Sequence, residues 1–327
     1  MRQISHFFLI LLLLVLLSSC RADRDVTVLK LAHGLDVSHP VHQGMVYMAD
    51  QVRERSNGKM TIDIYPSQQL GTEREALELL QIGSIDMTKV SSSVLEGFDR
   101  IYTIYSVPFL FESIEHAYRV WDSPVGRRLL HAGHDIRLHG LTYYDAGARS
   151  FYTKERPIRH PDDLQGMAIR VQESPAAIRM VNLMGGSATP ISWGELYTSL
   201  QQGIVDGAEN NLPSIYLSRH YEVVDYLSMN EHTAVPDILF ISLFRWNRLS
   251  DQERSWLQAA ADASARHQRK LWHASSEESL QGIRDAGIDV IYPDKVPFME
   301  KMEPIYRDLE QDSVMGPLMN QIRELAP

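Results

Sequence analysis

The sequence repeats itself at an offset of 120 residues, from position 72 to position 192, across a segment with the pattern of a helix followed by a strand. Thr72 and Ser192 each stand three residues before a glutamate, and this spacing is typical of a capping box that begins a helix. Both helical stretches run into the same pattern, Leu-Gln-x-Gly-x-x-Asp, which begins at Leu80 and at Leu200. Glycine after an apolar helical run ends the helix, and a buried strand is expected next. Two copies of this unit predict an α/β fold with two lobes, and two facing lobes enclose a cleft.

The polar residues directly after the two repeated units are candidates for the walls of that cleft. In an open parallel sheet, ligands bind beyond the carboxyl ends of the strands. The residues in that position are Ser91 to Ser93 after the first unit and Glu209 to Asn211 after the second. We therefore expect Ser91, Glu209, Asn210 and Asn211 near the ligand.

Further strands and helices follow from the spacing of apolar residues. Val26 to His33 alternates as a strand, Pro40 to Arg55 has helical spacing, and Met60 to Tyr65 alternates again, which is the order of a β-α-β unit. Four more strands are predicted, at Leu141 to Asp145, Ser150 to Thr153, Met167 to Val171 and Asp289 to Tyr292.

A long helix is predicted near the end of the chain. Ser250 and Glu253 form another capping box, and the helical pattern after them meets no Gly or Pro until Gly282. Such a helix is long for a globular protein. It either breaks near Ala274 or spans both lobes as a brace.

The N-terminus has the pattern of an export signal. Arg2 is followed by an unbroken apolar run from Phe7 to Leu17, which is shorter than the ~20 residues that cross a bilayer. Small residues then lead to Cys20, in a pattern that resembles a lipobox. On this interpretation residues 1–19 are a lipoprotein signal peptide, Cys20 is the lipidated first residue of the mature protein, and residues 20–25 are a tether. The alternative is an ordinary export signal in which the cysteine is incidental.

Composition and charge argue against nucleic-acid binding and against a fold that depends on disulfides. The 327-residue chain has a formal net charge of -10, and binding to a nucleic-acid backbone relies on Lys and Arg clusters that it lacks. Nucleic acid is therefore not an expected partner. Because Cys20 is the single cysteine, no disulfide is expected, and a chain of ~300 residues buries enough surface to fold without one. Membrane contact is expected through an N-terminal lipid only.

Two arginines are the strongest candidates for ligand binding. Arg149 lies at a junction between two predicted strands, and Arg170 is the polar residue near the end of the apolar strand Met167 to Val171. An unpaired guanidinium at a half-buried strand end is costly, so each arginine needs an anion. A ligand carboxylate would supply it, and Arg fits both carboxylate oxygens with its planar fork. A structural salt bridge to one of the 42 Asp and Glu residues is the alternative.

Other polar and aromatic side chains are weaker candidates, and each has a structural alternative. Glu73 and Trp193 follow the two helix caps at equivalent positions. Glu73 would either accept hydroxyl hydrogen bonds from a ligand or favour the helix dipole. Trp193 would be a flat wall against a small ligand or an apolar contact at the helix start. Asn210 would bridge to a ligand oxygen or satisfy a turn, and His33 would face the cleft or be a structural histidine.

The motifs of common enzyme classes are missing. Gly185-Gly186-Ser187 lacks the spacing of a nucleophile elbow, and no Gly-rich phosphate loop occurs. Histidines cluster at positions 33, 39 and 42 and at positions 131, 134 and 139, but without the spacing of a zinc motif. We therefore expect no catalytic residue, no cofactor and no metal.

Three segments resemble a known family, the solute-binding proteins of tripartite ATP-independent periplasmic (TRAP) transporters. They are the runs that begin at Tyr65 (YPSQQLG), Gly166 (GMAIRV) and Asp206 (DGAENN), and the similarity covers nearly all of the mature chain. The resemblance implies two α/β lobes joined by hinge strands and braced by a long helix. It implies a first lobe of residues 26–145 plus about 236–275 and a second of 146–235 plus about 276–327. A periplasmic receptor that binds an organic acid, with the permease membrane subunits as its partner, is the implied function.

The resemblance also implies roles for individual residues. The family's selectivity arginine falls on Arg170, its second ligand-contacting arginine on Arg149, its cleft asparagine on Asn210 and an aromatic wall on Trp193. Ser91 and Glu173 stand where sialic-acid binders have an acidic residue and an asparagine, so sialic acid is not the expected ligand. The stretch from Asn210 to Asp237 is similar to members that bind hexuronates such as glucuronate or galacturonate. Capture of a C4-dicarboxylate, and an exported sugar-acid hydrolase that uses Glu73 and Glu209, remain as alternatives.

Overall fold

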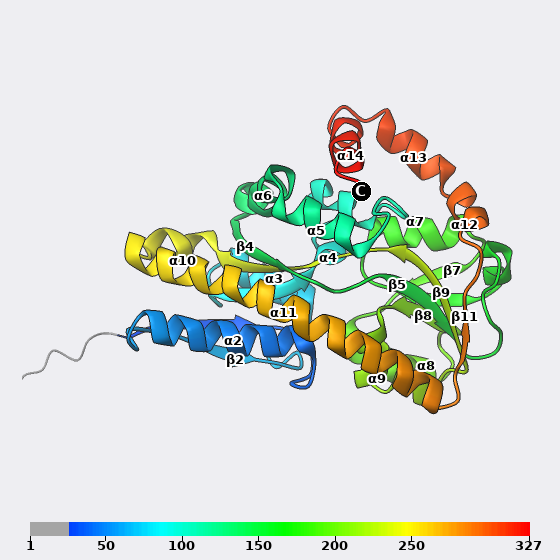
Figure 1. Ribbon diagram of the computed structural model, residues 1–327, viewed down its shortest axis with the longest axis horizontal. Helices are drawn as coiled ribbons and strands as arrows, with labels where there is room; N and C mark the ends of the chain where they lie inside the picture. The colour runs from blue at the N-terminus through cyan, green and yellow to red at the C-terminus, as the bar shows by residue number, and fades with distance from the viewer. Residues whose placement is uncertain (1–25) are drawn as a thin grey trace, which may run out of the picture.

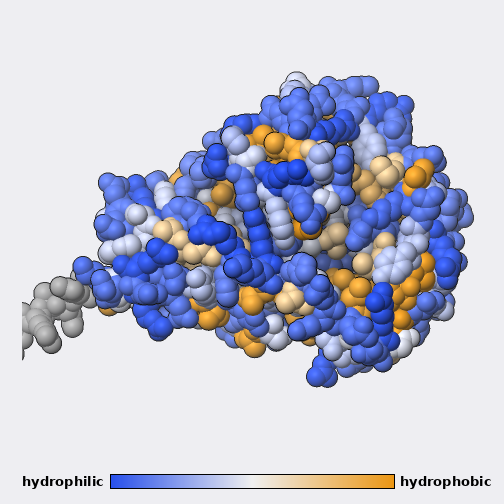
Figure 2. Space-filling model, in the orientation of Figure 1, coloured by the Kyte–Doolittle hydropathy of each residue, from blue (hydrophilic) through white to orange (hydrophobic). Residues whose placement is uncertain are grey.

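The computed structural model describes residues 26–327, and these form two β-sheets that lie side by side with helices around them (Figure 1). The two-lobed α/β fold expected from the repeat is confirmed. The space-filling view shows mostly polar side chains on this face, with apolar ones gathered in separate patches (Figure 2). Within the described residues, no helix is long and apolar enough to cross a membrane.

The first sheet has the strand order β2-β1-β3-β10-β4. Its strands are β1 Thr27–Ala32, β2 Met60–Tyr65, β3 Met87–Ser91, β4 Leu138–Tyr144 and β10 Asp237–Ser242. The helices that pack on it are α2 Pro40–Arg55, α3 Glu73–Gln81, α4 Ser92–Leu95, η1 Arg100–Ser106, α5 Ile114–Asp122, α6 Pro124–His131, η2 Ala132–Ile136 and α10 Leu243–Arg248. β1 is parallel to β2 and β3, whereas β10 is antiparallel to both of its neighbours.

The second sheet has the order β11-β9-β5-β8-β6-β7. Its strands are β5 Arg149–Thr153, β6 Ala168–Val171, β7 Ser187–Pro190, β8 Gly207–Asn210, β9 Tyr226–Thr233 and β11 Asp289–Ile291. Its helices are η3 Pro161–Leu164, α7 Pro175–Leu183, η4 Trp193–Glu195, α8 Leu196–Gln201, α9 Leu212–Leu217, η5 His220–Glu222, α12 Val296–Lys301 and α13 Glu303–Glu310. Here β5 is antiparallel to both of its neighbours, so both sheets are mixed rather than wholly parallel.

The internal repeat corresponds to a shared topology of the two sheets. The order β2-β1-β3-β10 in the first sheet matches β7-β6-β8-β5 in the second, with three parallel strands and then one antiparallel strand in each. β3 and β8 begin at positions 87 and 207, which keeps the offset of 120 residues. The antiparallel strand of each sheet is the one that has just crossed from the other lobe, through residues 145–148 or 234–236.

The two repeated helices begin differently. Thr72 forms the expected capping box, since its Oγ1 accepts from the Glu75 N–H and its own N–H donates to the Glu75 carboxylate. Ser192 makes no capping bond to the backbone; its hydroxyl donates to the Glu195 side chain, and a 3-10 turn precedes α8. The prediction of a second capping box, at Ser192, was therefore wrong. Gly194 in this turn lies against Gln68 of the first lobe, so close that a Cβ at Gly194 would be 2.3 Å from Gln68 Oε1.

The long helix α11, Asp251–Asp285, is one continuous helix and does not break near Ala274. At 1.5 Å per residue its 35 residues span about 50 Å. Leu257 and Ala261 pack in the core beneath the first sheet, while Ile283 packs in the core of the second lobe. The helix therefore braces both lobes, as Figure 1 shows.

The last helix, α14 Met315–Arg323, lies in the first lobe, in contrast to the expectation that residues 276–327 belong to the second. Met315, Met319 and Ile322 are buried among the side chains of η1, α3 and α5. The Ile322 carbonyl also lies 2.8 Å from His116 Nε2 in α5. The chain thus returns to the first lobe through α13, because the amphipathic α14 finds its apolar partners there.

Candidate functional site

A cavity lies between the two lobes, at the carboxyl ends of β3, β6 and β8 and against the two linkers. Seven of the nine ligand-binding residues expected from the sequence line it, namely Glu73, Ser91, Arg149, Arg170, Trp193, Asn210 and Asn211. His33 and Glu209 are absent from its lining, which also includes His39, Lys89, Gln172 and Asp237. We call this space the interlobe cavity.

Arg170 is a buried cation without a carboxylate partner among the described residues. It sits in β6 and is 3% exposed. Its Nε donates to the Ile191 carbonyl at 2.9 Å, while its NH1 nitrogen has no hydrogen-bond partner within residues 26–327. Burial lowers the pKa of this guanidinium. An uncompensated buried charge is costly, which makes this arginine the candidate in the interlobe cavity for pairing with an anion.

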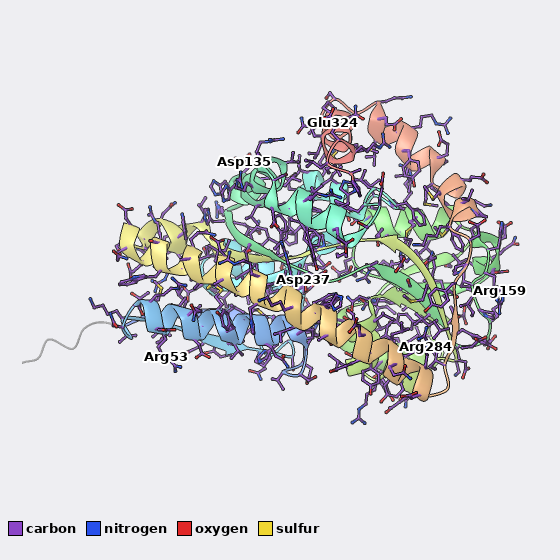
Figure 3. All side chains as sticks on the ribbon, viewed as in Figure 1. Arg53, Asp135, Arg159, Asp237, Arg284 and Glu324 are labelled. Carbon is purple, nitrogen blue, oxygen red and sulfur yellow. The ribbon has the colours of Figure 1, made fainter. Side chains whose placement is uncertain are left out.

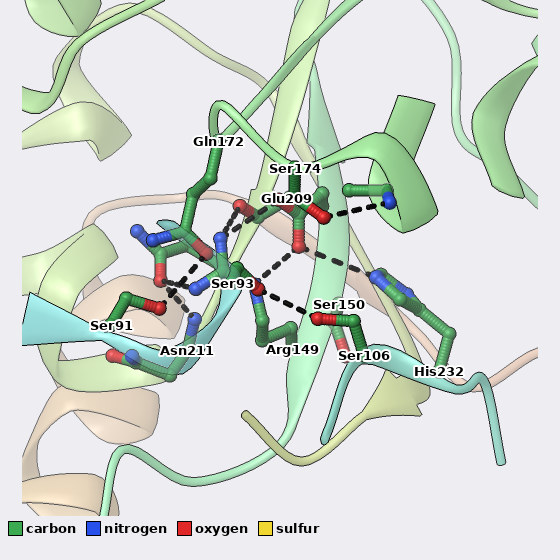
Figure 4. Close-up of polar contacts among 12 residues, drawn as sticks. Ser91, Ser93, Ser106, Arg149, Ser150, Gln172, Ser174, Glu209, Asn211 and His232 are labelled. Carbon is green, nitrogen blue, oxygen red and sulfur yellow. Dashed lines mark hydrogen bonds and ion pairs between the residues drawn. The ribbon is translucent and has the colours of Figure 1, made fainter. Parts of the chain in front are cut away.

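Arg149 is held by a carboxylate of its own lobe. Its Nε and NH2 nitrogens donate to the two carboxylate oxygens of Glu209, and its NH1 donates to Asn210 Oδ1 at 2.9 Å (Figure 4). Burial alone would raise the pKa of Glu209, but Arg149 and His232 bring it down to about 2. The alternative of a structural salt bridge thus describes Arg149, which pairs with Glu209. Arg149 still lines the cavity, whereas Glu209 lies behind Arg149.

An ion triad forms the first-lobe side of the cavity. It consists of the buried Lys89 and Asp237 with the half-buried Glu73, and we call it the Lys89 triad. Lys89 is 2% exposed, and its Nζ lies 2.8 Å from Glu73 Oε1 and 3.2 Å from Asp237 Oδ2. Burial alone would lower the pKa of Lys89, but Asp237 and Glu73 raise it overall. Figure 3 labels Asp237 at the centre of the molecule, where the two lobes meet. One cation between two carboxylates leaves the triad with a net charge of about -1.

Lys89 and Asp237 were missed by sequence reasoning. The available signal was a lysine within β3, a strand whose five residues are all buried. Asp237 begins β10, which pairs with β3 so that Asp237 lies opposite Ser91. A lone charge in a buried strand requires a partner on a neighbouring strand.

Several contacts join the lobes across the cavity. Ser91 Oγ donates to Gln172 Oε1 at 3.3 Å, and Trp193 packs against apolar side chains of both lobes. Glu96, at the end of α4, accepts from Ser174 Oγ at 2.8 Å and from the Ala176 N–H at 3.1 Å, at the start of α7. The first lobe thus binds the N-terminus of a helix of the second lobe.

His33 lies behind the cavity wall. Its Nδ1 accepts from the Leu35 N–H at 3.1 Å, and its Nε2 is 3.0 Å from His42 Nδ1. Burial, with the neighbouring Lys89, lowers its pKa to about 2, so the ring is neutral. His33 therefore has the contacts of a structural histidine, the alternative to one that faces the cleft. His39 lines the cavity in its place, with Nε2 3.4 Å from Ser214 Oγ.

Comparisons with known proteins agree on one family. The family model described as bacterial extracellular solute-binding protein, family 7, matches residues 31–312. A solute-binding protein of Chromohalobacter salexigens is 35% identical over 276 residues, which are 84% of this chain and 82% of that protein.

Two similar crystal structures contain a bound ligand. A TRAP periplasmic solute-binding protein of Anaerococcus prevotii with bound D-glucuronate has a TM-score of 0.89 and 34% identity, covering 91% of this chain and 98% of that one. One of Xanthobacter autotrophicus with bound β-D-galacturonate has a TM-score of 0.88 and 34% identity, covering 90% of this chain and 99% of that one.

Proposed function

Because the chain belongs to family 7 of the bacterial extracellular solute-binding proteins, the receptors of TRAP transporters, we propose that it captures a hexuronate in the periplasm. Glucuronate and galacturonate are the ligands we expect, and the membrane permease is the partner that receives them. The proposal rests on one observation, the buried Arg170 guanidinium with an unpartnered NH1 in a cavity between two lobes.

The ligand carboxylate pairs with Arg170, since a guanidinium binds both oxygens of a carboxylate in one plane. Arg149 and Asn210 contribute donors from the same lobe, and Trp193 forms a flat wall. The Glu73 carboxylate accepts hydrogen bonds from ring hydroxyls. These polar groups would be left unsatisfied by a small apolar acid, which supports a hydroxylated ligand.

Ser91, Asn211, Glu209 and His33 have other roles in this proposal. Ser91 and Asn211 line the cavity, and Asn211 also caps α9 through the Ser214 N–H. Glu209 positions Arg149 instead of contacting the ligand, and His33 supports the loop behind the wall. Because Glu209 is committed to Arg149 and has a lowered pKa, it is poorly suited to act with Glu73 as the acid and base of a hydrolase.

A thermal-shift screen tests the proposed function. A ligand that binds only the folded state raises its melting temperature. We expect glucuronate and galacturonate to raise it, and sialic acid and succinate to leave it unchanged. A shift with succinate alone would favour the C4-dicarboxylate receptor, and no shift with any acid would contradict the receptor proposal.

The contact of Glu96 with α7 predicts a variant that weakens binding without touching the ligand. Glu96→Ala removes two hydrogen bonds that join the lobes, and charged hydrogen bonds contribute about 1.5–3 kcal/mol each. We expect the Kd for glucuronate to rise at least ~10-fold in calorimetric titration. The exposed Glu155→Ala is the control, and an unchanged Kd in Glu96→Ala would show that closure does not depend on this contact.

We also propose that Cys20 carries a lipid that anchors the receptor to a membrane. The support is the apolar run Phe7 to Leu17 followed by Ser19 and Cys20, all of which lie outside the described residues. Mass spectrometry of the purified protein should find a diacylglyceryl group on an N-terminal Cys20, and Cys20→Ser should release the protein from membranes. A mature N-terminus elsewhere, without lipid, would contradict the anchor.

A further inference from the structure

The charged groups buried around the interlobe cavity are balanced in number. Three cations are buried there, Lys89, Arg149 and Arg170. Three carboxylates accompany them, Glu73, Glu209 and Asp237. These six groups have a net charge of zero, so a bound ligand adds its own charge to a set that is already neutral.

The pairing within this set is uneven. Arg149 has both oxygens of Glu209, and Lys89 has one oxygen from each of two carboxylates. Arg170 is the one of the three without a carboxylate within ion-pair distance in residues 26–327. The cavity thus has one uncommitted cation on the second-lobe wall and a net negative triad on the first-lobe wall.

From this arrangement we propose that the Lys89 triad is a specificity determinant that restricts the ligand to a single carboxylate. The proposal rests on the proposed function and defines its ligand class: hexuronates bind, whereas hexarates, which carry a carboxylate at both ends of the same carbon chain, are rejected. Asp237 is the decisive residue, because it is the second carboxylate on a lysine that already has one.

Repulsion within the closed cavity is the physical cause of the rejection. A hexuronate places its carboxylate on Arg170 and presents only hydroxyls and a ring oxygen elsewhere, and the triad carboxylates accept from those hydroxyls. A hexarate brings a second carboxylate into a space whose remaining cations are already paired. Like charges brought together in a buried site repel each other strongly. Burial and Glu73 raise the pKa of Asp237, which is consistent with a carboxylate in an environment that disfavours further negative charge.

The proposal predicts that neutralising one carboxylate of the Lys89 triad allows a dicarboxylate to bind, because the repulsion comes from that carboxylate. Asp237→Asn leaves Lys89 and Glu73 as a one-to-one pair and frees part of the lysine's hydrogen-bonding capacity. Glu73→Gln does the same with Asp237 as the remaining partner. Neither change leaves a buried charge without an opposite charge, so both variants are expected to fold.

The test compares galacturonate with galactarate, which carries a carboxylate in place of the aldehyde carbon and therefore cannot close the sugar ring. Galactonate, an open-chain acid with one carboxylate, separates the effect of the lost ring from that of the second charge. Kd values would be measured by calorimetric titration at one pH and ionic strength. For the wild-type protein we expect galactarate to bind at least ~100-fold more weakly. In Asp237→Asn that ratio should fall at least ~10-fold through a gain in galactarate affinity, and Glu73→Gln provides a second variant. Glu155→Gln is the control, since Glu155 carries the same charge but is exposed and lies outside the cavity lining.

The outcomes separate this inference from the proposed function. Equal binding of the two acids by the wild-type protein would contradict the single-carboxylate rule and leave the hexuronate proposal intact. If Glu155→Gln admits galactarate as well as Asp237→Asn does, the selectivity comes from overall charge and the assignment to the triad is wrong. If the protein binds a different monocarboxylate and rejects its dicarboxylate analogue, the hexuronate proposal fails and the rule holds.

Discussion

Arg170→Ala is expected to raise the Kd for glucuronate by about 100-fold or more, the largest effect of any single substitution in the cavity. The ligand carboxylate would lose its one uncommitted cationic partner, and truncating one side of a buried charge pair costs about 2–5 kcal/mol. Calorimetric titration measures this loss. The unliganded variant should not be destabilised, since Arg170 is a buried charge without a carboxylate partner in the described chain.

Arg159→Ala provides the control for that experiment. Arg159 is exposed and lies at the edge of the second lobe, far from Asp237 in Figure 3. Its removal changes the net charge equally and should leave the Kd unchanged. Arg170→Lys should recover only part of the affinity, because an ammonium cannot form the bidentate contact. An Arg170→Ala protein that binds glucuronate normally would refute the assignment of the carboxylate to this residue.

The second large effect is expected on stability, at the pair of Arg149 and Glu209. Arg149→Met leaves the Glu209 carboxylate buried without its cation, and breaking a buried pair in this way costs about 3–5 kcal/mol. The free energy of unfolding in urea should fall by that amount. In the double variant Arg149→Met with Glu209→Gln, no charge is left unpaired, so part of the loss should be recovered.

An exposed ion pair gives the reference for this measurement. Arg53 and Asp50 lie on the surface of α2, with more than half of each side chain exposed. Arg53→Met should change the free energy of unfolding by less than about 0.5 kcal/mol. If the double variant at Arg149 and Glu209 were as unstable as the two single changes added together, the pairing would not be the source of the stability.

Much of the fold could be predicted because its signals are local. The bounds Pro40–Arg55 and Met60–Tyr65 agree with the structure, since proline begins the helix and Asn57-Gly58 follows its end. The repeat predicted two lobes because a capping pattern, a helix and a strand recur at a fixed spacing. At Ser192 the local pattern predicted a capping box that the structure lacks, and Gly194 in the same turn packs against Gln68 of the other lobe, a contact that a local pattern cannot predict.

The site was predicted in part, and the missing part depends on strand pairing. The sequence indicated that Arg149 and Arg170 each need an anion. It did not indicate which of the two arginines is paired with a carboxylate of the protein itself. That depends on β8 lying beside β5, which brings Glu209 to Arg149. The Lys89 triad depends likewise on β10 returning from the second lobe to pair with β3. The placement of α14 follows from tertiary packing too, because an apolar helix face in the sequence does not identify the lobe on which it packs.

The exchange of strands between the lobes restricts the order in which this protein can fold. The first sheet lacks β10, the strand that joins β3 to β4, until residues 237–242 have been made, and the core around η1 and α5 lacks Met315 and Ile322 until α14 has been made. The first lobe therefore cannot complete its core while the chain is still being synthesised, although its strands β1 to β3 come first. The final helix is thus the piece that completes the lobe that β1 begins.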